Sequence, residues 1–376
     1  MDLRKYLFVD NHAHSILKRQ SDLDAFTIRS AFSESRSRQV IENDVPSSLH
    51  YRHMLRELKW PTGFRDEADL IDSRSKIAQA EYIRTLWDDV YIIGMIIDDG
   101  FVSDQMMPLV ELAAASGRTL YHCRRIENVI EKCISKAKTF DECWEDFTTS
   151  LFVENPYAPV ALKTIMAYRG GLQLDAVTKD EAAADFVDAK KQFNSGSMRI
   201  ERRPLYHYLL LQAFELAGCY DIPVQVHTGL GDDDANIVDS DPAQFQSVIK
   251  MPTLQHTKFV LLHCYPYVRQ AAMLCALYPN VYMDLSLSIN LISPAASHMV
   301  LEALACAPST KLLAGTDGHT CPESHWYAVR SWKQALSRAL DELMENHFID
   351  LHDGERIAAD VLHANAIRLY KLEGLV

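Results

Sequence analysis

The sequence lacks the features that mark several common classes of protein. None of its eight cysteines forms a C-x-x-C pair, so the sequence indicates neither a zinc knuckle nor a disulfide framework. The formal net charge of -13 shows no basic excess, which disfavours a nucleic-acid-binding surface. The sequence has no internal repeat and no low-complexity segment. We therefore expect reduced, mostly buried thiols and no nucleic-acid partner.

Long hydrophobic runs are absent as well. No apolar segment approaches the roughly 20 residues that a membrane-spanning helix needs, so we expect no membrane partner. The first residues, MDLRKYLFVDNHAH, are too polar and too short for a cleavable signal, which predicts a cytoplasmic protein. Apolar residues make up 48% of the 376 residues, enough for a large core. A homo-oligomer is compatible with this composition.

Short apolar runs alternate with amphipathic stretches along the chain, a pattern typical of a parallel sheet with crossover helices. The predicted strands lie near 6–11, 91–97, 118–122, 158–165, 222–227, 257–263, 280–285 and 310–316. The predicted helices lie at 201–218, 242–250, 266–278, 293–306 and 323–347. Gly218 stands where a left-handed helix cap favours glycine. The pattern predicts an α/β fold, a (β/α)8 TIM barrel that spans 1–376 as a single domain.

Two segments interrupt this alternation. Residues 18–90 form a long polar and largely helical insertion after the first strand, and residues 123–157 form a smaller helical one. Long loops on barrels often carry function, so the first insertion is interpreted either as a lid over the substrate or as decoration of the rim.

Histidines and one aspartate fall at the ends of the predicted strands. The carboxyl ends of barrel strands face one cavity, and side chains two residues apart on a strand share a face. A lone histidine there is more often structural than a ligand. Five such residues together predict a metal site, because imidazole and carboxylate are the ligands of zinc and related ions. They are His12, His14, His227, His263 and Asp317.

Lys163 lies within the apolar stretch PVALKTIMAYRGGL of the fourth predicted strand. An ordinary lysine has a pKa of about 10.4 and, as a cation, cannot bind a metal. Addition of carbon dioxide would convert the amine into an anionic carbamate that can bridge two ions. The alternatives are a neutral buried lysine and a cation paired with an acid.

These residues resemble the ligand set of the amidohydrolase superfamily. The phrases LKTIMAYRGGL, VHTGLGDDDANI, LLHCYPYVRQAAMLCALYPNVYMDLSL, AGTDGHTCPESHW and HANAIRLY are similar to the amidohydrolase-related group that also occurs fused to glutamine-synthetase-like domains. The resemblance covers residues 6 to about 372 and does not extend to the 18–90 insertion.

The resemblance implies a role for each ligand. His12, His14 and Asp317 would bind a first metal, His227 and His263 a second, and carboxylated Lys163 would bridge the two. Single-metal relatives use the strand-five histidine and the aspartate with the first pair. One or two divalent ions are therefore expected, zinc first, with manganese or iron as alternatives.

The implied activity is hydrolysis of an amide or ester of a small carboxylate-bearing metabolite by a metal-activated water. Asp317 would act as the catalytic proton acceptor, with His263 contributing to catalysis. The alternatives are a metal-dependent decarboxylase of the same superfamily and a barrel that only binds.

Residues near the strand ends are candidates for substrate binding. Arg169 could bind a carboxylate through two contacts, or form a surface ion pair. His122 and His319 are further candidates, and Cys264 is an alternative nucleophile. Lower-ranked candidates are Arg124, Arg125, His325, Trp326 and the loop 231–236, which is either solvated or contacts a substrate amine.

Overall fold

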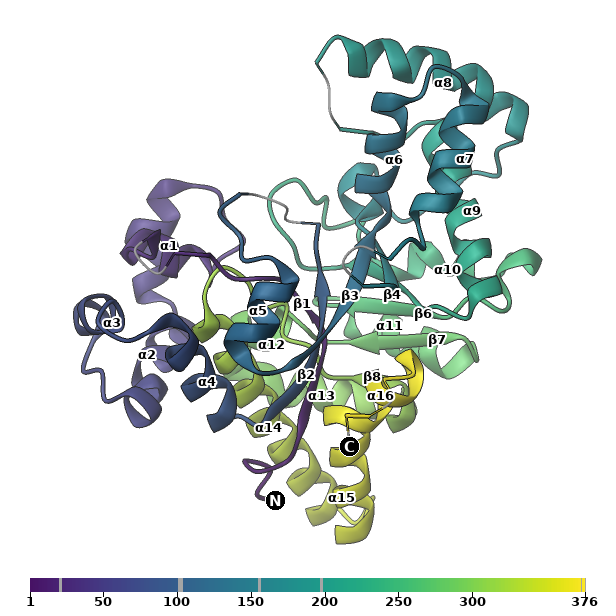
Figure 1. The fold of residues 1–376 in the computed structure, drawn as a ribbon. Helices are drawn as coiled ribbons and strands as arrows, with labels where there is room; N and C mark the ends of the chain where they lie inside the picture. The colour runs from purple at the N-terminus through teal and green to yellow at the C-terminus, as the bar shows by residue number, and fades with distance from the viewer. Residues whose placement is uncertain (20–21, 101–103, 155–156, 197–198, 373, 376) are drawn as a thin grey trace.

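Eight parallel strands form one sheet in the order β1-β2-β3-β4-β5-β6-β7-β8, as seen in the computed structural model (Figure 1). The structure describes residues 1–19, 22–100, 104–154, 157–196, 199–372 and 374–375. Residues 20–21 and 155–156, within the two predicted insertions, lie outside the described residues. The strands are β1 (Phe8–Ala13), β2 (Ile92–Asp98), β3 (Thr119–Arg125), β4 (Pro159–Thr164), β5 (Val224–Thr228), β6 (Phe259–His263), β7 (Val281–Asp284) and β8 (Leu312–Leu313).

The chain after β8 bonds back to β1 and nearly closes the sheet. The backbone N–H of Asn11 donates to the carbonyl of Ala314 at 3.0 Å, and the N–H of Asp317 donates to the carbonyl of His12 at 2.8 Å. β8 is therefore shorter than the predicted 310–316, because the residues after Leu313 turn toward the end of β1. The predicted (β/α)8 barrel is confirmed.

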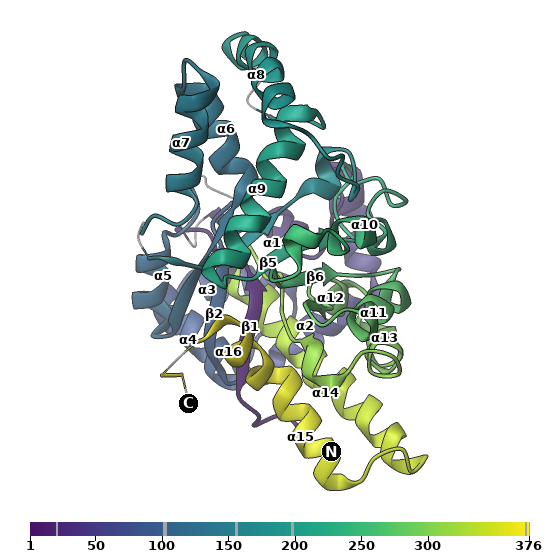
Figure 2. The same ribbon diagram turned by 90° about the vertical axis from the view of Figure 1, so that its right-hand side faces the viewer.

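Helices surround the barrel (Figures 1 and 2). The α-helices are α1 (Ala25–Ser30), α2 (Leu49–Thr62), α3 (Glu67–Arg74), α4 (Gln79–Asp89), α5 (Leu109–Ser116), α6 (Ile126–Lys136), α7 (Phe140–Ser150), α8 (Lys179–Asn194), α9 (Pro204–Tyr220), α10 (Gln246–Ile249), α11 (Val268–Leu277), α12 (Ser288–Leu291), α13 (Ala296–Leu304), α14 (Pro322–Glu345), α15 (Leu351–Ala359) and α16 (Asn365–Tyr370). Short 3-10 or π turns are η2 (Val40–Asp44), η3 (Val45–Ser47), η4 (Met166–Arg169), η5 (Pro242–Phe245), η6 (Pro252–Leu254), η7 (Ser293–Ala295), η8 (Ser309–Lys311) and η9 (Asp360–Ala364).

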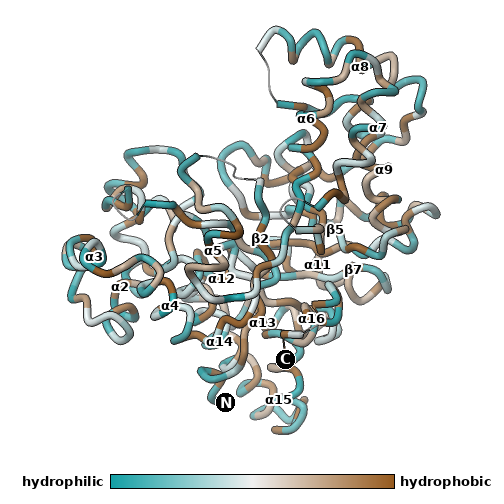
Figure 3. Tube along the Cα trace, in the orientation of Figure 1, coloured by the Kyte–Doolittle hydropathy of each residue, from teal (hydrophilic) through white to brown (hydrophobic). Residues whose placement is uncertain are grey.

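The core has two parts. One fills the inside of the barrel, where Val9, Val260 and Leu262 pack with Leu369 and Tyr370 of α16. The larger part lies between the strands and the surrounding helices. Figure 3 shows hydrophobic segments gathered at the barrel and hydrophilic ones along the outer loops. The barrel interior is thus a packed core, and the site must lie at the strand ends.

Both predicted insertions are helical. The first contains α1 to α4, with α4 packed against α14 and α5. In the second, α6 and α7 join α8 and α9 from the next connection to form a helical extension beyond the end of β3 (Figures 1 and 2).

The predicted cap at Gly218 is wrong. Gly218 lies inside α9, and the left-handed residue at its end is Asp221, with a φ of 53°. A Cβ at Gly218 would lie 2.7 Å from Thr257 Oγ1, so close packing accounts for this glycine. Among the described residues, no helix is both long and apolar enough to cross a membrane.

Candidate metal centre

The side chains of the predicted metal site come together at the carboxyl ends of the strands. His12 lies in β1 and His14 directly after it; Lys163 lies in β4, His227 in β5, and His263 ends β6. These five side chains are buried. Asp317 follows β8, and its side chain is 12% exposed.

Two imidazoles and one carboxylate meet at a single point. Asp317 Oδ1 lies 3.1 Å from His12 Nε2 and 3.1 Å from His14 Nε2. One nitrogen each of His12 and His263 and one oxygen of Asp317 lie within 4.8 Å of one another. The rings of His227 and His263 are neighbours, with centroids 4.5 Å apart. The spacing suits ligands that share an ion.

The tautomers of His12 and His14 follow from their hydrogen bonds. His14 Nδ1 donates to the backbone carbonyl of Asp98 at 3.0 Å. His12 Nδ1 donates to Gln225 Oε1 at 2.8 Å, and the Gln225 amide is oriented because its Nε2 donates to the carbonyl of Asn11. With the proton on Nδ1, each Nε2 presents a lone pair to Asp317.

The same hydrogen-bond network continues to His263. Tyr370 of α16 accepts a bond from Gln225 and donates to Asn11 Oδ1, and Asn11 donates to Asp284 at 2.7 Å. Ser286 Oγ donates to the other oxygen of Asp284 and accepts from His263 Nδ1 at 2.9 Å. The Nε2 of His263 therefore also carries a lone pair.

This donor set fits a divalent cation. Burial lowers the pKa of His12 to about 4 and that of His263 to about 3, so both imidazoles are neutral at pH 7. Within the described part of the chain, neither Asp317 Oδ1 nor His227 Nε2 has a hydrogen-bond donor. Lone pairs and a carboxylate at 3.1 Å repel each other unless positive charge lies between them. A metal ion would supply that charge.

Lys163 reaches the same cluster. Its Nζ lies 3.1 Å from His12 Nε2, and burial lowers the pKa of the amine against the opposing charges of Asp98 and Asp317. Ala161, two residues earlier on β4, belongs to the core inside the barrel, so alternation explains why Lys163 points inward.

His263 departs from the alternation of its strand. Val260 and Leu262 face the barrel interior, so the next residue would point outward. His263 instead has a φ of 67°, and Asp317 has a φ of 51°. Left-handed backbone is uncommon outside glycine and is concentrated at functional sites.

A cavity of about 210 Å³ opens beside the cluster. Arg169 and His319, both predicted as substrate residues, line it together with Arg125. Arg169 lies 3.5 Å from Glu131, and its buried Nε has no hydrogen-bond partner among the described residues. Burial lowers the pKa of His319 to about 4. The cavity thus offers a cationic and a neutral donor near the candidate metal ligands.

The structure does not bring His122 to this cavity. His122 and Arg124 lie on the other face of β3, where His122 bonds to Asp99 and Arg124 bonds to backbone carbonyls. Strand alternation instead turns Arg125 inward, where it pairs with Asp98 at 2.6 Å.

Three other candidates also lie outside the cavity lining. His325 bonds to the carbonyl of His14 at 3.0 Å and so supports that ligand. The indole of Trp326 donates to Asp89. Cys264 is buried, and burial raises the pKa of its thiol well above the ordinary value, which disfavours a nucleophilic thiolate.

Several cavity residues were not predicted from the sequence. Asp98, which lies outside the lining but is grouped with His12 and His14 as a possible metal ligand, ends an apolar strand, so the rule used for His263 could have found it. Tyr168 adjoins Arg169 in the motif AYRGG. Glu34 and Arg36 come from the 18–90 insertion, where no strand end marks them. The predicted loop 231–236 reaches the rim through Asp232 and Asp234.

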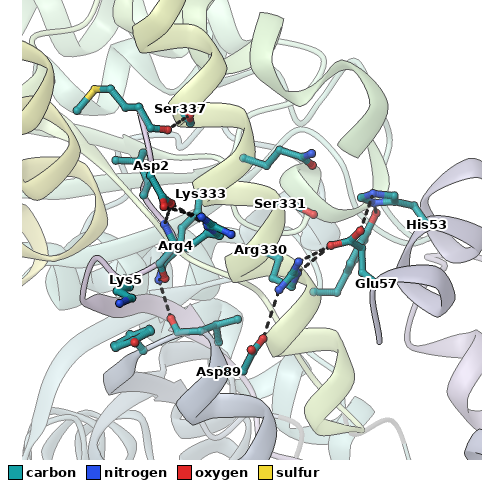
Figure 4. Close-up of a pocket in the computed structure, with 16 residues that line it drawn as sticks. Asp2, Arg4, Lys5, His53, Glu57, Asp89, Arg330, Ser331, Lys333 and Ser337 are labelled. Atoms are coloured by element: carbon teal, nitrogen blue, oxygen red, sulfur yellow. Dashed lines mark hydrogen bonds and ion pairs between the residues drawn. The ribbon is translucent and has the colours of Figure 1, made fainter. Parts of the chain in front are cut away.

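A second cavity, of about 730 Å³, lies away from these residues, between the N-terminal segment, α2 and α14 (Figure 4). Two of its cations are already bonded: Arg330 binds Glu57 and Asp89, and Lys333 Nζ donates to the carbonyls of Tyr6 and Val90. We assign it no function.

Replacing Gln225 with leucine is expected to weaken metal binding about 10- to 100-fold, because His12 loses the acceptor that fixes its tautomer and ring. Competition with a chromophoric chelator measures the affinity. Gln212→Leu, on α9, is the matched control. Unchanged affinity in a folded Gln225→Leu protein would contradict the role of this network.

Known proteins resemble the chain in sequence and fold. A family model described as amidohydrolase matches residues 186–372. Protein fluG of Emericella nidulans is 28% identical over 403 residues, which cover 98% of this chain and 46% of that protein. The chain thus spans about half the length of this curated relative.

Two solved structures extend the comparison. A protein of Lactobacillus casei ATCC 334, provisionally described as a metal-dependent hydrolase, has a TM-score of 0.89 and 28% identity, covering 100% of this chain and 99% of that one. Uronate isomerase of Thermotoga maritima, with a TM-score of 0.70, 13% identity and coverage of 98% and 95%, shares the fold alone. The family match over residues 186–372, the barrel and its histidine and aspartate cluster fit the amidohydrolase superfamily of metal-dependent enzymes.

Proposed function

We propose that the protein is a metal-dependent hydrolase that cleaves an amide or ester of a small carboxylate-bearing metabolite. The observation that carries this proposal is the meeting of Asp317 Oδ1 with the Nε2 lone pairs of His12 and His14, beside a cavity that holds Arg169. Such a donor set needs a cation, and the cavity supplies room and charge for a small anionic substrate.

The residues divide into two candidate metal sites. His12, His14 and Asp317 would hold a first ion, and His227 and His263 a second. Lys163, in its carboxylated form, would bridge them. In the single-metal alternative, His227 joins the first set and His263 orients the substrate or the water. Zinc suits the nitrogen and oxygen donors, and manganese or iron are alternatives.

A divalent ion bound here supplies Lewis acidity and lowers the pKa of water from about 15.7 toward 7. Asp317 accepts the proton of the attacking water at its carboxylate and returns it to the leaving group. The hydrogen bonds of Gln225 and Ser286 keep His12 and His263 in a single tautomer throughout. Arg169 binds the substrate carboxylate and orients the scissile bond.

Metal analysis and a substrate screen test this function. The purified protein should hold one or two equivalents of zinc, manganese or iron after growth with added metal. The metal-loaded protein should hydrolyse a member of a panel of N-acyl amino acids, dipeptides and lactones. A metal content well below one equivalent would overturn the proposal. Release of carbon dioxide without hydrolysis would favour the decarboxylase.

Replacing Lys163 with alanine is expected to reduce bound metal to at most one equivalent and to slow hydrolysis about 100-fold. The carboxylated lysine would hold the two ions in place, and without it the reacting groups lose their position. Lys132→Ala, an exposed lysine on α6, is the control. Metal content comes from mass spectrometry of the dialysed protein, whose intact mass also reports a carboxylated lysine. If metal content and activity do not change, Lys163 is not a bridging ligand.

A further inference from the structure

Glu34 brings a carboxyl group without a bonding partner into the candidate active-site cavity. It lies in the 18–90 insertion, in the loop between α1 and η2, and lines the same cavity as His14 and Asp317. Its carboxylate makes no hydrogen bond or ion pair with any residue that the structure describes. A partly buried carboxylate with no partner is costly for a fold to keep.

Two arginines that line the cavity, Arg36 and Arg199, are engaged in ion pairs. Arg36, two residues after Glu34, binds Asp232 at 2.6 Å and Asp234 at 2.9 Å. Arg199 binds Asp234 at 2.8 Å. The Arg36 pairs join the insertion to the loop after β5, and both arginines bind aspartates of that loop.

The surroundings of Glu34 disfavour the charged form of its carboxyl group. Burial, and next the charges of Asp317 and Asp232, raise the pKa of Glu34 to about 8, so the carboxyl group mostly holds its proton at pH 7 while the cavity is empty. A cationic group beside Glu34 would stabilise its carboxylate form and lower this pKa. Arg169 lines the same cavity with a buried Nε that has no hydrogen-bond partner among the described residues, so the cavity offers one site of each sign.

We propose that Glu34 binds a primary ammonium group of the substrate, with Arg169 binding its carboxylate, so that the substrate is an amide or ester of a small amino acid. This inference rests on the proposed hydrolase and narrows its substrate class. It also gives the insertion a part in specificity, because the binding residue comes from outside the barrel.

Binding of paired ligands to the zinc-loaded protein tests the ammonium site without any reaction. L-glutamate and glutarate, or L-aspartate and succinate, differ only in the amino group. L-glutamate should raise the Tm of the wild-type protein more than glutarate does, and the difference should disappear in Glu34→Gln. Glu42→Gln, in the same insertion but outside the cavity lining, should keep the difference. Equal shifts by both members of each pair, or no shift at all, overturn the proposal.

Hydrolysis adds a second readout. L-glutamine and glutaramate carry the same carboxamide and differ only in the amino group, and ammonia release measures both. Loss of one charge-assisted contact should lower kcat/KM of Glu34→Gln for L-glutamine about 10- to 100-fold, mainly through KM, and leave glutaramate unchanged. An equal loss for both would place Glu34 in the chemical step and overturn the ammonium site.

The two proposals fail separately. Selective binding of L-glutamate through Glu34, without cleavage of any amide or ester, would remove the hydrolase and keep the ammonium site. Cleavage that favours glutaramate over L-glutamine would keep the hydrolase and remove the ammonium site.

Discussion

Replacing Asp317 with asparagine is expected to lower the rate of hydrolysis by about 1,000-fold or more. Proton transfer by a positioned carboxylate contributes about 100- to 10,000-fold, and an amide cannot accept the proton. Asparagine also removes the negative charge that faces His12 and His14 at 3.1 Å, so bound metal should decrease as well. The measurements are kcat/KM on the substrate found by the screen and metal equivalents after dialysis.

Metal content separates the two roles of Asp317. Full metal content with a large loss of kcat would assign it to proton transfer alone. Asp188→Asn, an exposed residue of α8, controls for the loss of one negative charge. Activity within tenfold of the wild-type protein, with full metal content, would contradict both roles.

Replacing Glu323 with alanine is expected to lower the free energy of unfolding by about 3–5 kcal/mol. Glu323 at the start of α14 is fully buried and binds Arg74 of α3 at 2.7 Å. It also accepts a hydrogen bond from the Tyr82 hydroxyl at 2.9 Å. The change would leave the Arg74 guanidinium, whose side chain is 2% exposed, without its opposing carboxylate.

Urea denaturation measures this loss. Glu42→Ala removes the partner of Arg38 in an exposed pair and should change stability by less than about 1 kcal/mol. A loss of unfolding free energy below about 1 kcal/mol in Glu323→Ala would contradict the role of the Arg74–Glu323 pair in holding the insertion to the barrel. Because Glu323 joins α3 and α4 to the barrel, the change should also weaken ligand selection through Glu34.

The barrel could be predicted from the sequence because its signals are local. Each strand is a short apolar run, and each is followed by a helix of clear period. α8 was missed, although Thr178 and Glu181 form a capping box that marks its start. Gly218 was misassigned because the same glycine can serve a left-handed turn or a close helix packing, and only the position of Thr257 distinguishes them.

The candidate metal site was predictable for a related reason. In a parallel barrel, topology carries every strand end to one place, so polar residues that end apolar runs must meet. This rule predicted that His12, His14, His227 and Asp317 lie close together, and the structure brings them into one cluster. It failed for His122, because the last residues of a strand alternate in direction and the true strand end was not known.

The sequence by itself determined the class of the protein: a barrel whose strand ends carry histidines, a lysine and an aspartate. The tertiary structure decided how those groups are used. Only the structure shows the left-handed backbone that turns His263 inward. It also shows that Gln225 fixes the tautomer of His12 and that Ser286 fixes the tautomer of His263. Finally, it shows that Glu34 lines the same cavity as Asp317. These features depend on contacts between residues far apart in the chain, which no local pattern of residues specifies.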